Sequence, residues 1–481
     1  MFSLPSIRDF FRGLIRWTRS SGITETEFLE LEIRAWLTSK KRENMLTGRR
    51  YYDGMQDICD KQRTAIGEGG RERTVTNLPN SRLCDNRFAE LVDQKVNYLL
   101  SKPIEVKTED EAFKEALRPV FDTTFHRRLR NTGSDSMTAG IGYLHPYVSD
   151  GILKFKRFNP EEILPFWRDE DHEELDSFLR IYPTYVYEGE QPKIIWRAEH
   201  YTTDGVRRYI WTDAQQLVAD TQEPESYITY DGQPMNWERV PLVAFKYNAK
   251  EIPLICRVKC LQDALNTLVS NFADNMQEDV RHTILVIENY DGENLADFRR
   301  NLIAYGAVKV RTDSDSGRGG VKTLTVEVNA ANYEAIVKML RRAIIENGRG
   351  FDAKDERMSN QPNQMNIRSI YSDIDLDADG MELEFQAALQ QLMWFVRVYL
   401  GMRGQDSGDV EFIFNRDTPV NESEVINDCR ASVGIISKET IVANHPWTKD
   451  TAEELKRLKQ EEQEAGIGDY ANPGGESHDE E

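Results

Sequence analysis

One long apolar stripe, between residues 253 and 282, constrains the fold of this chain more than any other feature. Apolar side chains recur there at steps of three and four residues, the spacing of one helix face. They are Leu254, Val258, Leu261, Leu265, Leu268, Phe272 and Met276. A helix of roughly 25 residues is about 38 Å long. So narrow a stripe on so long a helix predicts packing against neighbouring helices of an assembly rather than burial in one subunit's core. The opposite face is polar and includes Gln262 and Asn266.

A small α/β segment and two further helices follow the stripe. Residues 283–328 begin with the β-rich run TILVIENY and contain short alternating runs, which predict a strand–helix–strand–strand insert. The helix over 329–350 ends at Asn347-Gly348, where a glycine can supply the positive φ of a helix C-terminus. The helix over 372–403 is apolar on nearly all sides, which predicts that it is buried.

The residues before the stripe indicate helices followed by antiparallel strands. Helices are expected from about Thr26 to Lys40 and from Asn86 to a stop at Pro103, with a loop over 61–75 between them. A hairpin is expected over 139–165. Short alternating runs separated by Asp-Gly turns then predict an antiparallel meander between 175 and 245. The fold class is therefore α+β.

Composition restricts the classes of function. The chain has 481 residues, a formal net charge of −21 and 39% hydrophobic residues, which fits a soluble globular protein of roughly two to four domains. A protein that grips DNA through its phosphates is expected to be basic, at least locally, whereas an acidic one can surround DNA while repelling it. Five cysteines favour a reduced setting, and no apolar run is long enough to cross a membrane.

Motifs for catalysis and metal binding are missing or incomplete in the sequence. We find no phosphate-binding loop, zinc-protease motif or nucleophile elbow, so neither an enzyme nor a cofactor is expected. Asp375, Asp377 and Asp379 resemble the first half of a calcium loop, but its twelfth position is Gln386 instead of a glutamate. They are weak metal candidates, and an acidic approach to a helix N-terminus is the preferred interpretation.

Three further segments differ from the folded middle of the chain. Residues 1–24 form a basic amphipathic arm, and docking on a partner or neighbouring subunit is favoured over a membrane-surface helix. Its apolar residues Phe10, Phe11, Leu14, Ile15 and Trp17 alternate with Arg8, Arg12, Arg16 and Arg19. Residues 351–371 form a polar loop that is unusually long for a compact domain. The acidic tail, 465–481, is expected to be disordered.

Three motifs in this order resemble the portal proteins of tailed bacteriophages, of the siphophage type common in phages of Gram-positive hosts. The first is the helix from Asn86, NRFAELVDQKVNYLLSKPI, in which Ser101 replaces the usual glycine. The second is the hairpin 139–165, which ends in PEEILP, and the third is 413–446, with FNRDTPVNESEVIND and GIISKETIVANHP. Together they extend the resemblance over about residues 50–460.

The resemblance implies an α+β portal fold and a ring of about twelve subunits at one capsid vertex. Double-stranded DNA enters through its central channel during packaging and leaves during ejection. The implied parts are the N-terminal arm (1–24), the wing (25–252 with the helix 372–403), the stem helices (253–282 and 329–350), the clip (283–328), the tunnel loop (351–371), the crown (404–464) and the tail (465–481).

The resemblance also implies sites and partners. Tunnel-loop residues Arg349, Lys354, Arg357 and Arg368 are expected to touch DNA. The oligomer seam is expected at Leu254, Val258, Leu261, Leu265, Leu268, Phe272, Tyr333, Ile336 and Leu340. Expected partners are further copies of the chain, the terminase large subunit, a head–tail adaptor, and the major capsid and scaffolding proteins. Assembly is expected in the host cytoplasm, with the product in the virion and without stable membrane association.

Two other classes of function stay open at this point. One is a metal-dependent DNA-processing enzyme that would use the carboxylates of residues 373–384. The other is a peripheral membrane scaffold that would be anchored by residues 1–20.

Overall fold

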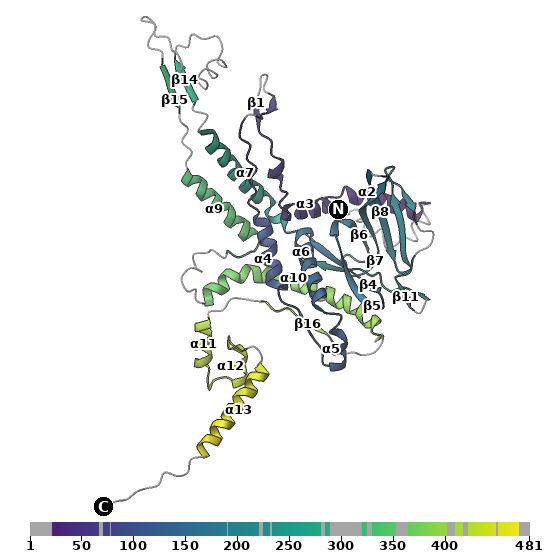
Figure 1. The fold of residues 1–481 in the computed structure, drawn as a ribbon, viewed down its shortest axis with the longest axis vertical. Coiled ribbons are helices and arrows are strands. Elements are labelled where there is room, and N and C mark those ends of the chain that lie inside the picture. Colours follow the sequence, from purple (N-terminus) through teal and green to yellow (C-terminus); the bar gives the residue numbers. More distant parts are fainter. Residues whose placement is uncertain are drawn as a thin grey trace, which may run out of the picture. The chain divides into compact units, whose positions relative to one another are not determined.

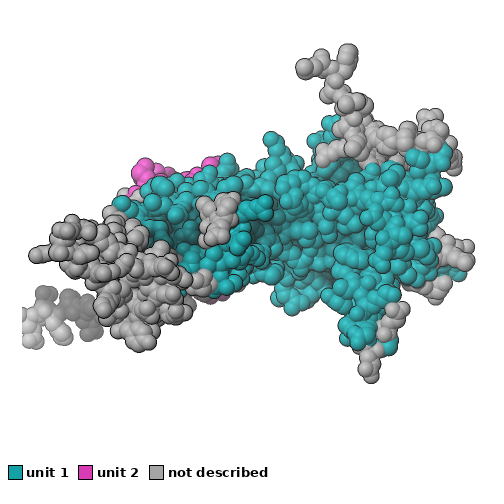
Figure 2. Space-filling view, turned by 90° about the horizontal axis from the view of Figure 1, so that it is seen from above, with its two compact units in different colours: residues 1–349, 378–415 teal, residues 350–377, 416–481 magenta. Residues whose placement is uncertain are grey.

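The chain has an α+β fold, as the sequence predicts. The computed structural model describes residues 22–66, 71–76, 78–189, 191–220, 225–230, 233–279, 284–288, 320–324, 330–352, 364–401, 409–416, 422–448 and 451–470. The chain divides into two compact units (Figure 2). Unit 1 comprises Met1–Arg349 and Ala378–Asn415, and unit 2 comprises Gly350–Asp377 and Arg416–Glu481. None of the described helices is both long and apolar enough to cross a membrane.

Unit 1 begins with two helices where the sequence predicts one. Helix α2 (Glu25–Leu37) starts with a capping box between Thr24 and Glu27. Helix α3 (Lys40–Tyr52) starts anew because the side chain of Ser39 accepts the N–H of Arg42 and caps it. Helices α4 (Arg87–Leu100), α5 (Glu111–Leu117) and α6 (Thr123–Ala139) follow. The predicted start of α4 is confirmed, since Asn86 is its N-cap.

Unit 1 contains a five-stranded antiparallel sheet with the strand order β10-β9-β8-β7-β6. Its strands are β6 (Ile163–Trp167), β7 (Leu175–Glu188), β8 (Gln191–Thr202), β9 (Gly205–Trp211) and β10 (Leu217–Ala219). Neighbours in the chain are neighbours in the sheet, so the predicted meander is confirmed for residues 175–219. The later strands that it was predicted to include, up to residue 245, belong to other sheets. Phe28, Leu29 and Ile33 of α2 share one buried cluster with residues of this sheet.

A three-stranded sheet contributes to a second buried apolar cluster, separate from the one that contains α2. Strands β4 (Ile141–Ser149) and β5 (Ile152–Phe158) form the predicted hairpin, and β13 (Val243–Lys246) pairs with β4. Strand β16 (Glu411–Ile413) pairs with β3 (Glu105–Lys107), and Phe412 lies in the same core. The structure therefore places residues 409–415 in unit 1, although the sequence analysis assigns them to the crown.

Two small hairpins and two 3-10 turns complete this part of unit 1. Strands β1 (Thr64–Ile66) and β2 (Glu72–Thr74) pair within the segment that the sequence predicts as a loop. Strands β11 (Ile228–Tyr230) and β12 (Gln233–Met235) form another antiparallel pair. The short turns are η2 (Asp57–Asp60) and η3 (Pro160–Glu162).

Two helices lie side by side and lead to a hairpin (Figure 1). Helix α7 (Ile255–Asp279) matches the first predicted stem helix, and α9 (Ala330–Asn347) matches the second. Between them, β14 (Ile284–Glu288) pairs antiparallel with β15 (Gly320–Leu324). The helix and the further strands predicted within 289–319 lie outside the described residues.

Helix α10 (Gln364–Tyr399) is longer than predicted and belongs to both units. Its second half is buried, as the sequence predicts, with Leu383 as an exception at 69% exposure. Residues 364–371 are helical, so the prediction of a loop up to residue 371 is wrong. The sequence explains why: Ile367, Ile370 and Ile374 follow helical spacing and are buried.

The described part of unit 2 also contains three further helices. They are α11 (Glu422–Ala431), α12 (Lys438–Asn444) and α13 (Thr451–Tyr470). The side chain of Ser437 caps α12. Helix α13 runs beyond residue 465, so the expectation of a disordered tail from that residue is wrong for 465–470. Residues 471–481 lie outside the described part.

Candidate functional site

Helix α7 buries a polar face. Gln262, Asn266, Ser270 and Asp274 recur at every fourth residue, and none is more than 2% exposed. We call these four residues the polar ladder. They bind main-chain groups of residues 81–88, which we call the strap. The strap is non-helical up to Asn86 and ends with the first two residues of α4. Main-chain N–H groups of the strap donate to side-chain oxygens of the ladder, in reverse chain order.

The ladder pairs every second strap residue with every fourth helix residue. Ser81 N–H donates to Asp274 at 2.6 Å, Leu83 N–H to Ser270 at 2.9 Å and Asp85 N–H to Asn266 at 2.9 Å. Gln262 accepts the next two N–H groups, of Arg87 and Phe88, at 3.1 and 3.2 Å. Two extended residues span about 6.6 Å and four helical residues about 6.0 Å, so the two periods match. The ladder thereby supplies acceptors that a neighbouring strand would otherwise provide.

Each ladder residue also forms a hydrogen bond or ion pair with a group other than the strap's N–H groups. The amide of Gln262 donates to the carbonyl of Asp85 at 2.6 Å and to Asn266 at 3.1 Å. Asn266 donates to Gln56, which is itself fully buried. Lys61 forms an ion pair with Asp274 at 2.9 Å. Because these buried polar groups are hydrogen-bonded, the network stabilises one fixed position of the strap on α7.

Helix α9 packs on the apolar side of α7. The rings of Phe272 and Tyr333 lie 4.5 Å apart, while Leu340 and Ile344 lie in the core that also contains Leu265. Arg341 of α9 also reaches the strap, through an ion pair with Asp85 at 2.9 Å. The two helices and the strap therefore form one connected group.

The C-terminus of α9 differs from the sequence prediction. The left-handed residue is Arg349, with φ 52°, rather than Gly348. Gly348 is needed for a different reason, because a Cβ there would lie 2.5 Å from Leu91 Cδ1. Lys95 of α4 donates to the carbonyl of Arg349 at 2.9 Å and is only 3% exposed. The helix end is thus held by α4 through close packing and a charged hydrogen bond.

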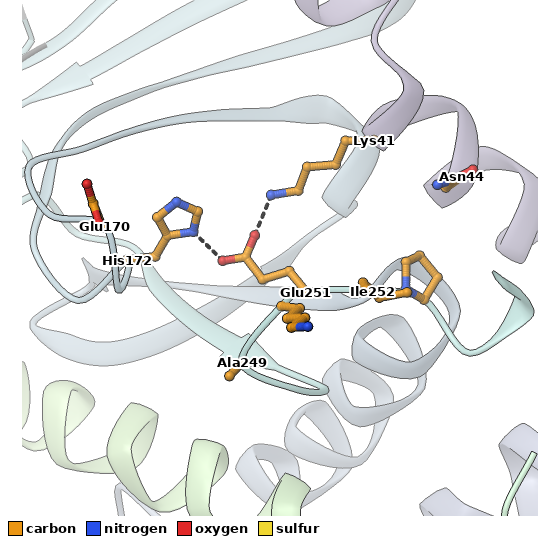
Figure 3. Close-up of a pocket in the computed structure, with 9 residues that line it drawn as sticks. Lys41, Asn44, Glu170, His172, Ala249, Glu251 and Ile252 are labelled. Carbon is orange, nitrogen blue, oxygen red and sulfur yellow. Dashed lines mark hydrogen bonds and ion pairs between the residues drawn. The ribbon is translucent and has the colours of Figure 1, made fainter. Parts of the chain in front are cut away.

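The N-terminal end of α7 is held by a buried carboxylate (Figure 3). Glu251 lies between Lys41 of α3 and His172 of the β6–β7 loop, and bonds to both. Burial acts to raise the pKa of Glu251, but the hydrogen bond from His172 and the charge of Lys41 outweigh it and lower the pKa to about 2. These residues line a cavity of about 430 Å³.

The predicted oligomer seam lies partly inside the subunit. Leu254, Val258 and Leu265 are 0% exposed and Leu340 is 9% exposed, all in the chain's own core. For the three stripe residues Leu254, Val258 and Leu265, the expectation that the stripe avoids the core of one subunit is wrong, because they have no surface left. Leu261, Leu268, Phe272 and Tyr333 are half-buried, and Ile336 is 41% exposed. For this second group, contact with a neighbouring subunit stays a prediction.

The structure locates two of the four predicted DNA-contacting residues. Arg349 follows the end of α9, and Arg368 is exposed in the first turns of α10 instead of in a loop. Lys354 and Arg357 lie within 353–363, outside the described residues. The segment that can form the predicted loop therefore shortens to about 350–363, between α9 and α10.

The weak calcium-loop candidates lie in a helix. Asp375, Asp377 and Asp379 all belong to α10, and so does Gly380, which a calcium loop would need in a sharp turn. Consecutive odd positions of a helix point in different directions, so the three carboxylates do not converge. Among the described residues, no group of three or more histidine, cysteine, aspartate or glutamate side chains could hold a metal ion.

Comparison with known proteins decides the family. Residues 38–467 match the family described as "Phage portal protein, SPP1 Gp6-like". The chain belongs to this family of phage portal proteins. Among its relatives, the portal protein of Bacillus phage SPP1 is 28% identical over 429 residues, which cover 87% of this chain and 84% of the relative. The portal protein of Clostridium phage phiCD119 is 26% identical over 452 residues, or 90% and 96% of the two chains.

The family match covers all the structure described above from Thr38 to Ile467, including the polar ladder and both helices. The protein is a phage portal protein, and such proteins are structural components of the virion. The resemblance inferred from the three sequence motifs is therefore confirmed. A portal protein assembles with other phage components into the capsid.

Sequence reasoning missed most of the portal's polar contacts. It places Gln262 and Asn266 on a polar face without a role, and it overlooks Ser270 and Asp274. Their spacing of four residues is the signal that could have revealed the ladder, since small polar residues at a helical period also indicate a buried polar stripe. Glu251 and His172 give no such signal, because they are 79 residues apart and meet only in the fold.

Proposed function

We propose that about twelve copies of this protein form a ring at one vertex of the capsid. Double-stranded DNA passes through the central channel during genome packaging and again during ejection. The observation that carries the proposal is the length of the family match, residues 38–467, together with portal-named relatives that are covered over 84% and 96% of their length. A match of this extent supports a shared assembly rather than one shared domain.

In this proposal α7 and α9 are the stem helices and the β14–β15 hairpin belongs to the clip. The clip contacts the terminase large subunit during packaging and the head–tail adaptor afterwards. The wing contacts the major capsid and scaffolding proteins. Exposed apolar side chains on the stem support contact between copies: Met339 and Ile336 on α9 are 61% and 41% exposed, and Met276 on α7 is 51% exposed.

In this proposal the portal catalyses no reaction, because the terminase hydrolyses the ATP that drives DNA packaging. The net charge of −21 supports a channel wall that repels phosphates and keeps the sliding DNA free of tight contacts. A few basic residues between α9 and α10, Lys354 and Arg357 with Arg349 and Arg368, touch the DNA transiently.

Analytical ultracentrifugation with negative-stain imaging of the purified protein tests the ring. We expect a particle of about twelve subunits with a central hole. A protein that remains monomeric at high concentration, even with its scaffolding protein present, contradicts the proposal.

The double substitution Lys354→Ala and Arg357→Ala tests the loop between α9 and α10. Rings should form normally, whereas DNA packaging or retention should fall. Unchanged packaging in that variant removes the loop from the mechanism.

A further inference from the structure

A ribbon of two strands extends beyond the five-stranded sheet. Strand β6 pairs with β7 only as far as Arg180, and β9 pairs with β8 only from Trp196 onward. Between these limits β7 and β8 pair only with each other, as far as Glu188 and Gln191. The hairpin from about 182 to 195 therefore has no further strand on either edge among the described residues.

One face of this ribbon is apolar and exposed. Residues directly opposite each other in an antiparallel pair lie on the same face. The pairs Pro183–Trp196, Tyr185–Ile194 and Tyr187–Pro192 therefore share one face, which we call the aromatic face. Tyr185, Tyr187 and Ile194 are 70%, 75% and 53% exposed. Neighbouring exposed side chains of this kind indicate a docking surface.

The aromatic face continues a surface that is covered elsewhere. Ile181 and Ala198, the next residues on the same face, are 2% and 0% exposed in the cluster that contains α2. Helix α2 thus covers the inner part of this face, whereas the described apolar side chains of its outer part are exposed. On each strand the buried residue, Ile181 or Ala198, lies two residues from the first aromatic-face residue, Pro183 or Trp196.

The chain enters the described structure on the same face. The carboxylate of Glu25, in the first turn of α2, lies 3.6 Å from Nδ1 of His200 and forms an ion pair with Arg207 at 3.4 Å. His200 and Arg207 are cross-strand partners, and His200 lies on the same face as Ala198. The first described helix therefore begins on this side of the sheet. From His200 to Ile194 is six residues, or about 20 Å along a strand.

We propose that residues 1–21 of the same chain dock on the aromatic face. Their apolar side chains Phe10, Phe11, Leu14 and Ile15 fall on one side at helical spacing. A helix of that length spans about 30 Å, which is enough to reach the ribbon. The arm would thus cover the part of the face that α2 leaves bare.

Site-specific photocrosslinking in the full-length protein tests this docking. We replace Tyr185 by p-benzoylphenylalanine and identify the crosslinked peptides by mass spectrometry. The expected crosslinks join position 185 to residues 8–17. The matched control carries the same probe at Thr184, which lies one residue away on the opposite face, and should give a yield several-fold lower. Equal yields at the two positions, or crosslinks from 185 only to other segments, overturn the proposal.

Variants of the arm supply an independent test. Leu14→Asp should lower the crosslink yield from position 185 several-fold, whereas Ser6→Asp adds the same charge at a polar position and should not. A mixture of isotope-labelled and unlabelled protein identifies the donor of the arm. Crosslinks between labelled and unlabelled chains would show a neighbouring copy as the occupant and overturn docking within one chain.

The remaining alternative is that residues 1–21 bind a lipid surface instead of the aromatic face. Co-sedimentation with phosphatidylcholine–phosphatidylglycerol vesicles, with and without residues 1–21, measures it. We expect no binding that depends on these residues, because the aromatic face holds their apolar side chains. Vesicle binding that is lost on their removal contradicts the proposal. None of these outcomes bears on the ring, so failure of the docking and failure of the proposed function can be told apart.

Discussion

The side chain of Asn266 accepts the backbone N–H of Asp85 at 2.9 Å, although 181 residues separate the two in the chain. This hydrogen bond lies in the middle of the polar ladder. Since the ladder binds mainly main-chain groups, it fixes the path of the strap while placing little demand on the strap's side chains. The helix, by contrast, must carry a hydrogen-bonding side chain at each of its four positions.

Replacing Asn266 by leucine is expected to destabilise the subunit. Leucine has a similar size but removes the acceptor of the Asp85 N–H and of one Gln262 amide N–H, and it removes the donor to the side-chain oxygen of Gln56. A buried group that loses its hydrogen bond costs about 1–3 kcal/mol. Urea unfolding followed by circular dichroism measures the loss, and hydrogen exchange should accelerate at the amides of Leu83 and Asp85.

Thr267→Ala is the control for this prediction. Thr267 is the next residue of α7 and is exposed, so its replacement should change the free energy of unfolding by less than about 0.5 kcal/mol. If Asn266→Leu unfolds at the wild-type urea concentration, the ladder contributes nothing to stability and the strap must be held by other contacts.

Glu251→Gln is expected to remove a pH-dependent part of the stability. The pKa of Glu251 is lowered from 4.5 to about 2, so its carboxylate stabilises the fold above pH 4.5 and loses this effect as the pH falls toward 2. A shift of this size corresponds to on the order of 3 kcal/mol. In the variant, the melting temperature should be lower at pH 7 and should change less than the wild type's between pH 4.5 and 2.

Glu170→Gln is the matched control, because Glu170 lines the same cavity but is exposed. Its melting curve should follow the wild type's at every pH. If Glu251→Gln leaves the acid dependence of the melting temperature unchanged, the bonds to Lys41 and His172 do not hold the start of α7.

Two glycines are expected to respond oppositely to alanine. At Gly348 the new Cβ would lie 2.5 Å from Leu91 Cδ1, and such overpacking costs about 1–3 kcal/mol. At Gly380, inside α10, nothing lies within 4 Å of the new Cβ, so alanine should stabilise the helix by about 0.5–1 kcal/mol. Thermal unfolding of both variants measures the difference. Stabilisation by Gly348→Ala would contradict the packing at Gly348, and destabilisation by Gly380→Ala would contradict the open helical site.

The sequence predicts which helices and strands this fold contains better than it predicts where they begin and end. Periodic apolar positions locate α7, α9 and the buried half of α10, and alternation locates the meander, because both patterns are local. The break at Ser39 and the extension of α10 to Gln364 were missed. In the first case one capping side chain decides the boundary, and in the second an acidic run obscures a helical stripe.

The candidate site was less predictable, because it depends on contacts between distant segments. An apolar stripe such as Leu254 to Met276 shows that a helix packs, but it does not say whether its neighbour is the same chain or another copy. The structure answers this for Leu265, which is fully buried within its own subunit. The polar ladder needed knowledge of the strap's path, which nothing in the strap's own sequence specifies.

Contact between stem helices of neighbouring copies predicts a difference between two aspartate variants. Met339 is 61% exposed on α9, so Met339→Asp should leave the subunit folded but prevent rings, because a charge would be buried unpaired between copies. Leu265 is 0% exposed, so Leu265→Asp should instead unfold the subunit itself. Circular dichroism measures folding, and sedimentation velocity measures assembly. Met339→Leu should assemble normally, and rings formed by Met339→Asp would place the interface on another face.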